Sequence, residues 1–320
     1  MSDPATRPAH VLAIDAGKTD TRVGLFEDGS PGAVRERVVG SDARHLSERT
    51  ADRVARALAT VDLPAGGVET AAAGIAGFEC ISARELAGLA DMLDEAVAAE
   101  SVVLASDAVI AHLGALGGEP GVVVAAGTGT VVLGWDGDGR FAKVDGWGQL
   151  LDDAGSAYAI GRQGLASALR EHDGRGGSTE LHGRAEKVFG PLEGLPSQLE
   201  RSTSAVRTVA AFAREVAAAV REGDDVAVAI FADAAAELAR GAVAAADRIF
   251  PDGVPVAICL CGGVSGSWDL MELVFTETIA ARRPAAVFVE PRGSTLAGAR
   301  RLATGDYDSA FSELVWRRAG

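Results

Sequence analysis

This sequence has few cysteines, no long apolar segment and too few basic residues to balance its acidic ones. Its three cysteines cannot form a disulfide framework, and none lies in a Cys-x-x-Cys pair. No stretch reaches the roughly 18 uninterrupted apolar residues of a transmembrane helix. The N-terminal segment contains Asp3 and Arg7 where a secretory signal peptide would have its apolar region. We therefore expect a protein of the reducing cytoplasm with no membrane partner.

The charge balance excludes a second group of functions. The chain has 45 acidic and 30 basic residues, so its formal net charge is −15. Proteins that bind nucleic acid or anionic lipid need a basic surface, so neither is expected as a partner. Apolar residues make up 48% of the 320 residues, which is enough for a large core and excludes general disorder. A chain of this length usually divides into two domains.

A glycine-containing turn between two apolar strands occurs twice. The first unit runs from Val11 to Phe26 around a turn at 15–21, and the second runs from Val122 to Trp135 around a turn at 127–130. Each is followed by a hairpin-type turn. Two such units of similar length, about 110 residues apart, indicate a duplicated domain.

The rest of the chain alternates between strand and helix patterns. Strands are predicted at 70–75, 102–105, 254–260 and 287–289, and helices at 47–60, 82–98, 107–116, 203–221, 226–248, 268–282 and 294–302. This alternation predicts an α/β fold with crossover connections. Residues 173–204 are rich in glycine, proline and charge and predict loops around one short helix. The Gly-Gly-Glu-Pro sequence at 117–120 predicts a domain boundary.

The two turns have the chemistry of a phosphate site. Glycine allows close approach of the backbone to an anion, and the hydroxyls of Thr19, Thr21, Thr128 and Thr130 add hydrogen-bond donors. The alternative is that both are plain hairpin turns. Neither turn is a P-loop or a dinucleotide fingerprint, because the glycine spacing of those motifs is missing.

Two carboxylates follow strand patterns. Asp15 lies at the end of the first strand, where it could hold Mg²⁺ through water, or could serve only as a turn residue. Asp107 opens a helix directly after the strand at 102–105. Ligands of α/β proteins usually bind at such strand ends, and Asp107 could accept a proton from an attacking hydroxyl. Its alternative role is helix capping, which Ser106 could also fill.

Two further features have both a functional and a structural interpretation: a glycine-rich stretch around Trp147 and a pair of cysteines. Trp147 is predicted to be buried, either as a pocket wall or as a core residue. Cys259 and Cys261 alternate on a predicted strand and face the same side. Core packing is the preferred interpretation of the cysteines, because a metal or cluster site would need more ligands nearby.

Taken in order, these motifs resemble the BadF/BadG/BcrA/BcrD ATPase family, in its branch of N-acetylglucosamine and glucosamine kinases of the actin, Hsp70 and sugar kinase superfamily. The likeness extends from Val11 to Leu302. Its motifs are Asp-x-Gly-x-Thr at 15–19, Ala-Gly-Ile-Ala-Gly at 73–77, Ser-Asp-Ala at 106–108, Gly-Thr-Gly-Thr at 127–130, Gly-Trp-Gly at 146–148, Asp-x-Gly-Ser-Ala-Tyr at 153–158 and Cys-Gly-Gly-Val at 261–264.

The resemblance implies an α/β fold of two ribonuclease-H-like, actin-like ATPase domains with a nucleotide cleft between them. The N-terminal domain would comprise residues 1–117, joined by a C-terminal helix at about 294–320. The C-terminal domain would comprise residues 118–293 and carry a helical insertion. The implied activity is ATP-dependent transfer of a phosphoryl group to a hydroxyl of a sugar or aminosugar, with Mg²⁺ as cofactor. A small-molecule sugar is the expected partner, and a homodimer is left open.

The same resemblance implies a role for each motif residue. Asp107 would be the catalytic base, and Asp15 would hold the metal. ATP would be bound by Gly17, Lys18, Thr19, Gly127, Thr128, Gly129, Gly262 and Gly263. Substrate would be bound by Gly77, Thr130, Gly146, Trp147, Gly148 and Asp153.

The chain departs from the family pattern at several of these motifs. Lys18 stands at a usual glycine and Asp20 at a usual basic residue. Val131 and, approximately, Ala43 stand at usual asparagines, and Ala154 stands at a usual glutamate. Lys18 is the only basic side chain in either turn. Lost amides remove hydrogen bonds to substrate hydroxyls, so the sugar is left open. Two alternative functions are an ATPase that activates a partner reductase and a non-catalytic sugar or nucleotide sensor.

Overall fold

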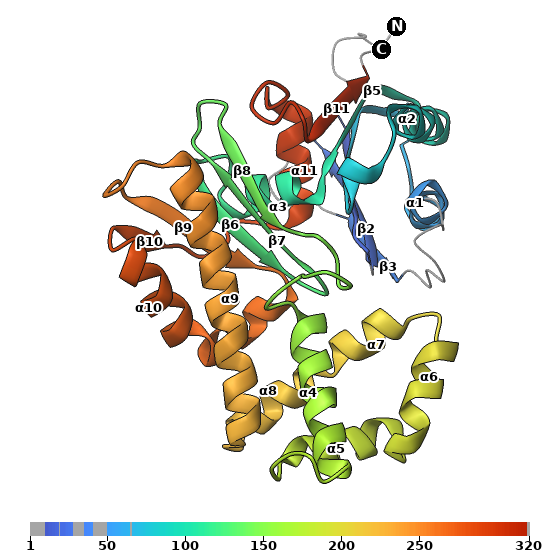
Figure 1. The fold of residues 1–320 in the computed structure, drawn as a ribbon. Coiled ribbons are helices and arrows are strands. Elements are labelled where there is room, and N and C mark those ends of the chain that lie inside the picture. Colours follow the sequence, from blue (N-terminus) through green and yellow to red (C-terminus); the bar gives the residue numbers. More distant parts are fainter. Residues whose placement is uncertain (1–9, 19, 28–34, 41–49, 65, 319–320) are drawn as a thin grey trace, which may run out of the picture. The chain divides into compact units, whose positions relative to one another are not determined.

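The computed structural model describes residues 10–18, 20–27, 35–40, 50–64 and 66–318. The chain divides into two compact units. The first contains the residues up to Pro120, residues 136–141 and the residues from Pro291 onward. The second contains residues 121–135 and 142–290. Each unit is built on its own β-sheet (Figure 1).

The sheet of the first unit has the strand order β11-β5-β4-β1-β2-β3 in the described residues. Its strands are β1 (His10–Ala16), β2 (Asp20–Glu27), β3 (Arg35–Gly40), β4 (Val68–Ile75), β5 (Ala99–Ser106) and β11 (Val315–Arg318). Strands β1, β4 and β5 are mutually parallel, and β2 is antiparallel to β1. The carboxyl ends of β1, β4 and β5 therefore meet at one edge of the sheet.

Helices cover both faces of this sheet. Figure 1 shows α1 (Thr50–Leu58) and α2 (Ala83–Val97) on one side, and α3 (Asp107–Ala115) and α11 (Thr295–Thr304) on the other. Alternate residues of β1, namely Leu12, Ile14 and Ala16, are buried in a core that includes α1 and α2. Because side chains alternate along a strand, Asp15 points to the face that carries α3 and α11.

Glycines bring α3 and α11 into close backbone contact. A Cβ on Gly298 of α11 would collide with the carbonyl oxygen of Ile110, and a Cβ on Gly114 of α3 would collide with that of Ser294. On the sheet below, a Cβ on Gly74 of β4 would collide with the Ile110 side chain. These three positions hold the two helices firmly against the sheet, since no side chain can separate them.

The second sheet repeats the strand order of the first, without a counterpart of β11 among the described residues. Its strands are β6 (Gly121–Ala126), β7 (Thr130–Trp135), β8 (Phe141–Asp145), β9 (Val256–Cys261) and β10 (Ala286–Phe288), in the order β10-β9-β6-β7-β8. As in the first sheet, the first strand lies between its antiparallel hairpin partner and a parallel strand that follows a long connection. The predicted duplication of a hairpin-led α/β unit is confirmed.

The long connection of the second unit is helical. Its helices are α4 (Ala157–His172), α5 (Glu180–Phe189), α6 (Leu195–Arg201), α7 (Ala205–Ala211), α8 (Ala213–Arg221) and α9 (Asp225–Ile249), and α10 (Glu272–Arg282) follows β9. Leu238, Ala239, Ala242, Ala245 and Ala246 of α9 are buried in a core that includes β6 and β9. The small alanine side chains allow this long helix to pack closely on the strands.

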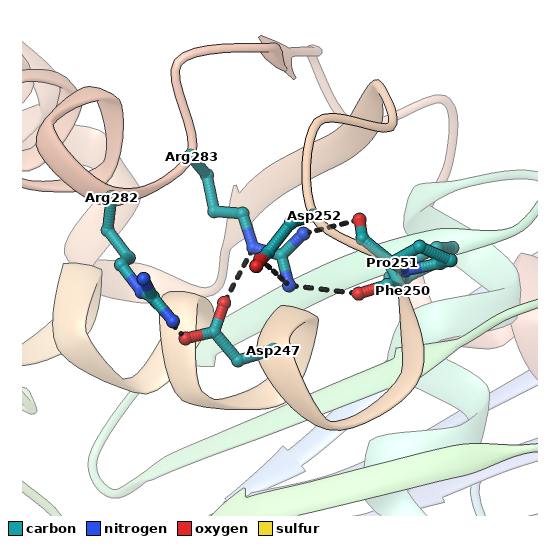
Figure 2. Close-up of polar contacts among 6 residues, drawn as sticks. All are labelled: Asp247, Phe250, Pro251, Asp252, Arg282 and Arg283. Carbon is teal, nitrogen blue, oxygen red and sulfur yellow. Dashed lines mark hydrogen bonds and ion pairs between the residues drawn. The ribbon is translucent and has the colours of Figure 1, made fainter.

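Arginines from the end of α10 hold the C-terminal end of α9 (Figure 2). The Arg283 guanidinium is buried and donates hydrogen bonds to Asp247 Oδ1 at 2.6 Å and to the carbonyl oxygens of Phe250 at 2.9 Å and Pro251 at 2.8 Å. Arg282 Nε donates to the second oxygen of Asp247 at 3.1 Å. Carbonyls at a helix end have no partner inside the helix, so Arg283 supplies one together with a favourable positive charge.

Several predicted elements differ from the structure. Residues 173–204 contain both α5 and α6, so the prediction of one short helix among loops was wrong. The C-terminal helix expected at about 294–320 ends at Thr304, and β11 follows it and pairs with β5. Strands β3, β8 and β11 were not predicted, because their short mixed sequences show no apolar alternation. No helix in the described ranges is long and apolar enough to cross a membrane.

Candidate functional site

Three of the predicted site residues lie at the carboxyl edge of the first sheet. Asp15 pairs with Gly74 across β1 and β4, and Gly74 pairs with Ala105 across β4 and β5. Gly77 follows the end of β4, and Asp107 directly follows β5. The topology therefore brings the predicted metal residue, one predicted substrate residue and the predicted base to a single edge.

Asp15 has a partner that the sequence did not suggest. Its half-buried carboxylate accepts a hydrogen bond at Oδ2 from Thr295 Oγ1, at 2.6 Å. Thr295 is the first residue of α11, and the preceding Ser294 caps that helix by accepting from the Ala297 amide. Asp15 Oδ1 lies toward the first turn, 4.0 Å from the position that a Cβ on Gly17 would occupy.

A buried arginine lies against the first turn. Arg53 of α1 is 8% exposed, and its Nη1 donates to the carbonyl oxygen of Gly17 at 2.7 Å. Lys18 is exposed, and Thr19 lies outside the described residues. The sequence placed only Lys18 at this turn, whereas the fold adds a second positive charge from a residue 36 positions away.

Asp107 is the first residue of α3 and is half-buried. The helix cap is Ser106, whose hydroxyl makes no capping bond and instead lies 3.4 Å from Glu79 Oε1 and 3.5 Å from Asp107 Oδ1. Glu79 reaches this position because Gly77, with a left-handed φ of 74°, starts the short 3₁₀ turn Phe78–Cys80. A carboxylate in the first helical turn is favoured by the helix dipole. Ser106, and not Asp107, occupies the N-cap position of α3.

The second turn is held by the start of α4. The Gly127 amide donates to the Gly129 carbonyl at 2.8 Å and closes the turn. The amides of Ala157 and Tyr158 donate to the carbonyls of Gly127 and Thr128, at 2.9 and 3.2 Å. The first amides of a helix have no partner inside the helix, and those of α4 hold the second turn in place.

Gly262 and Gly263 lie beside the second turn within the same unit. Ala125 pairs with Cys261 across β6 and β9, so the next residues, Ala126 and Gly262, are neighbours. A Cβ on Gly262 would lie 2.5 Å from the Ala126 carbonyl oxygen, and Gly262 has a φ of 92°. Only glycine combines this approach with this conformation. Gly262 and Gly263, which were predicted to bind ATP, therefore lie beside the second turn.

Two carboxylates organise the glycine-rich loop of the second unit. Asp153 is 1% exposed and accepts from the Gly148 amide at 3.1 Å, while its other oxygen lies 2.5 Å from where a Cβ on Gly129 would be. Asp145 Oδ1 accepts from the amides of Gly146 at 2.6 Å and Asp153 at 3.3 Å. Burial raises the pKa of Asp145 above its ordinary value. The charges of Asp152 and Asp153 raise it further, and the two amide hydrogen bonds lower it. The loop is therefore tied to the second turn at its base.

Trp147 projects from this loop. Its side chain is 73% exposed, and those of Leu150 and Leu151 are exposed as well. The prediction of a buried Trp147 was wrong, because the hydrogen bonds at Asp145 and Asp153 hold the backbone of the loop while its apolar side chains face outward. The Thr130 side chain, unlike that of Trp147, is buried. Its Oγ1 is buried and has no hydrogen-bond partner in the described part of the chain.

The cysteine pair lies on β9. Burial raises the pKa of Cys259 to about 11, with a contribution from the Glu290 charge, and that of Cys261 to about 12. Raised thiol pKa values are typical of structural cysteines, which are unreactive because the thiolate is the nucleophile. Among the described residues, no cluster of three or more His, Cys, Asp or Glu side chains could hold a metal ion.

Sequence reasoning missed four residues with a part in these arrangements, namely Arg53, Glu79, Asp145 and Thr295. Asp145 carries a local signal, since it directly precedes the Gly-Trp-Gly sequence. The other three have none, because their contacts join segments that are distant in the chain.

The class of the fold is that of the actin-like ATPases and sugar kinases. The structure aligns with TM-score 0.68 and 25% identity to a Chromobacterium violaceum protein described as a candidate N-acetylglucosamine kinase, over 91% of this chain and 98% of that one. It aligns with TM-score 0.60 and 20% identity to a ROK family glucokinase from Streptomyces griseus solved with glucose and AMPPNP, over 92% and 99%.

Sequence comparison gives the particular family. The chain belongs to the BadF/BadG/BcrA/BcrD ATPase family, whose model matches residues 12–299. It is 28% identical to the N-acetylmuramic acid/N-acetylglucosamine kinase of Clostridium acetobutylicum over 209 residues, which are 65% of this chain and 68% of that protein. A stretch of 77 residues, 24% of each chain, is 40% identical to the N-acetyl-D-glucosamine kinase of Dictyostelium discoideum.

Proposed function

We propose that this protein is a kinase that transfers the γ-phosphoryl group of ATP to a hydroxyl of a sugar or aminosugar, of the glucosamine or N-acetylglucosamine type. Its family of ATPases supports the use of ATP, and its kinase relatives support the sugar acceptor. The observation that carries the proposal is the convergence of Asp15, Gly77 and Asp107 at one sheet edge. This edge combines a phosphate-binding turn with a carboxylate able to accept a proton.

Asp107 is the proposed catalytic base. The sugar hydroxyl oxygen attacks the γ-phosphorus, the bond from that phosphorus to the ADP oxygen breaks, and the hydroxyl proton passes to the Asp107 carboxylate. The half-buried position at the start of α3 supports this role, since the backbone holds the carboxylate in place.

ATP is bound, in this proposal, by Gly17, Lys18, Thr19, Gly127, Thr128, Gly129, Gly262 and Gly263. Arg53 supports the first of these segments, because it holds the Gly17 carbonyl and brings a cation close to the turn. Lys18 and Arg53 offset the repulsion between the triphosphate and a chain of net charge −15. The Gly127 amide is already used within its turn, so the remaining donors of that turn must meet the anion.

The residues at the sheet edge fit Mg²⁺ as a cofactor. Mg²⁺ prefers oxygen ligands and, in phosphate sites, is held by one or two carboxylates together with waters and substrate phosphates. Asp15 supplies one oriented carboxylate, with Oδ2 held by Thr295 and Oδ1 toward the first turn. When bound with ATP, Mg²⁺ would neutralise charge on the transferring phosphoryl group.

The proposed sugar contacts are Gly77, Thr130, Gly146, Trp147, Gly148 and Asp153. The exposed indole of Trp147 supports this assignment, since an aromatic face can pack on a sugar ring. A Cβ on Gly146 would lie 3.2 Å from a Val131 methyl, so the apolar residue at position 131 packs directly under this loop.

We also propose that the two compact units are the ribonuclease-H-like domains, and that the protein is a cytoplasmic homodimer.

The test is a coupled kinase assay over glucosamine, N-acetylglucosamine, N-acetylmuramic acid and glucose. We expect sugar-dependent ADP release that falls by roughly 100-fold or more in Asp107→Asn, because the variant cannot take up the proton. Asp138→Asn, in the exposed turn between β7 and β8, is the control for loss of a carboxylate and should match the wild type.

Two results would contradict the proposal. Nucleotide hydrolysis that no sugar accelerates would argue against a kinase. Near wild-type sugar phosphorylation by a folded Asp107→Asn variant would remove Asp107 from its proposed role.

A further inference from the structure

The N-terminal end of α11 supplies a hydroxyl to the carboxylate of Asp15. We infer that Thr295 is a positioning residue for Asp15, and through it for the divalent cation that accompanies ATP. The inference rests on the proposed function, since it needs nucleotide binding at the first turn.

The contact between Thr295 and Asp15 is short and directional. Thr295 Oγ1 donates to Asp15 Oδ2 at 2.6 Å, the distance typical of a hydroxyl bonded to an ionised carboxylate. Such bonds are roughly twice as strong as those between neutral groups. The bond fixes the plane of the carboxylate, with Oδ1 on the side of Gly17. A metal ligand is oriented in this way by groups that do not touch the metal themselves.

The Thr295 hydroxyl is not needed to cap its own helix. The preceding Ser294 performs that role, because its Oγ accepts from the Ala297 amide. Threonine and serine near a helix start are usually explained by capping. Here two consecutive hydroxyl residues have different partners. Ser294 caps the helix, and Thr295 donates to the carboxylate of Asp15.

The backbone around Thr295 allows little movement. The Ser294 carbonyl lies against Gly114, and the Arg292 amide donates to the Ala115 carbonyl at 2.9 Å, so the segment that leads into α11 is joined to the end of α3. Gly298, one turn into α11, packs on the Ile110 carbonyl. The helix that begins with Asp107 and the helix that begins with Thr295 therefore form one packed pair above the edge where Asp15 lies.

The experiment measures metal binding in the presence of nucleotide. Mn²⁺ replaces Mg²⁺, and the free ion is followed by electron paramagnetic resonance during titration of the full chain with ADP present. We expect Thr295→Val to weaken Mn²⁺ binding about tenfold, the lower end of what loss of an outer-shell partner usually causes. ADP binding measured calorimetrically with excess EDTA should not change, because the hydroxyl acts on the cation through Asp15.

Matched variants separate this role from general damage to the fold. Thr295→Ser keeps the hydroxyl and should restore wild-type Mn²⁺ affinity. Thr304→Val removes a threonine hydroxyl from the other end of α11, where it donates to the Arg300 carbonyl of its own helix. This variant should bind Mn²⁺ as the wild type does. Thr295→Ala gives a second loss of the hydroxyl if the valine variant does not fold.

Failure of the inference and failure of the proposed function give different results. If the wild type binds Mn²⁺ with ADP and both Thr295→Val and Thr295→Ala bind it equally well, the inference is wrong and the proposed function stands. If the wild type binds no ADP, with or without the cation, both are wrong. Equal loss of binding in Thr295→Ser and Thr295→Val would also overturn the inference, because size and not the hydroxyl would then matter.

Discussion

The two glycine turns contain equivalent threonines, Thr21 and Thr130, to which the proposed function gives different roles. Thr21 closes the first turn by pairing with Ala16, and Thr130 closes the second by pairing with Ala126. Both hydroxyls are buried and lack a hydrogen-bond partner among the described residues. A buried hydroxyl without a partner destabilises the folded state. Thr130 is also a proposed substrate residue, whereas Thr21 is not. Comparing variants of the two therefore separates the effect of the hydroxyl on stability from its effect on substrate binding.

We expect Thr21→Val to stabilise the protein by about 1 kcal/mol, because valine has nearly the same shape and removes the unsatisfied hydroxyl. Thr130→Val should give a similar gain in the free energy of unfolding and, in addition, lower kcat/KM for the sugar about tenfold, as expected for one lost hydrogen bond. Urea unfolding and the kinase assay measure the two effects. Unchanged kcat/KM in Thr130→Val would remove Thr130 from the substrate site, and destabilisation by Thr21→Val would show that its hydroxyl is satisfied.

At the scale of the elements, the long helix α9 is held at both ends by charged side chains. At its C-terminal end, Arg283 satisfies the carbonyls of Phe250 and Pro251 (Figure 2). At its N-terminal end, Asp224 accepts from the Ala227 amide at 2.7 Å. The second oxygen of Asp224 accepts from the Thr179 hydroxyl at 2.8 Å and the Glu180 amide at 2.7 Å. One carboxylate thus joins the starts of α9 and α5.

This junction gives a pH dependence with a definite sign. Burial alone would raise the pKa of Asp224, but its hydrogen bonds to Ala227, Thr179 and Glu180 outweigh burial and lower it below the ordinary value of 3.8. A carboxyl with a lowered folded-state pKa stabilises the protein above the unfolded-state value, and this contribution is lost as pH falls through the folded-state value.

Asp224→Asn should therefore destabilise the protein by about 1 kcal/mol at pH 7, because the amide has no charge and only one oxygen to accept the bonds now shared by two carboxylate oxygens. The difference from the wild type should shrink as the pH falls below 3.8. Chemical unfolding at a series of pH values measures it, and Asp225→Asn, the next residue along, is the control. A difference that stays constant down to pH 2 would show that the charge of Asp224 contributes nothing.

At the scale of the whole chain, the two sheets share one strand order, and each carries its own set of proposed site residues. The edge of the second sheet also bears on assembly. Strand β10 is the last strand on its side of that sheet among the described residues, and its Val287 and Phe288 side chains are exposed. An exposed apolar edge strand is a site for pairing with another chain. This supports the proposed homodimer.

We expect sedimentation equilibrium to give twice the chain mass of 32.6 kDa. Val287→Lys should give the monomer mass, because a lysine on an edge strand opposes pairing. Val254→Lys, a change of the same kind at an exposed loop residue before β9, should leave the dimer intact. A wild type that sediments as a monomer would contradict the proposal.

The parts of the structure that could be predicted are those that depend on neighbours in sequence. The strands other than β3, β8 and β11 follow from apolar periodicity, which acts over a few residues. The two turns follow from glycine, and the position of Asp107 follows from the strand before it. Strand β11 and helices α5 and α6 could not be predicted in this way. The sequence of β11 is short and polar, and this strand is ordered by pairing with β5. Helix α5 packs against α4 and α8, and α6 contacts α7.

The sequence by itself determined that two hairpin-led units would each present a glycine turn, and that Asp15 and Asp107 would lie at strand ends, because a few consecutive residues encode each of these features. Only the tertiary structure decided what surrounds them. Arg53 reaches Gly17 across 36 positions, and Thr295 reaches Asp15 across 280. Such contacts depend on which elements pack together and how closely, and here glycines at the crossing of α3 and α11 permit the approach. No local pattern encodes a contact of that kind.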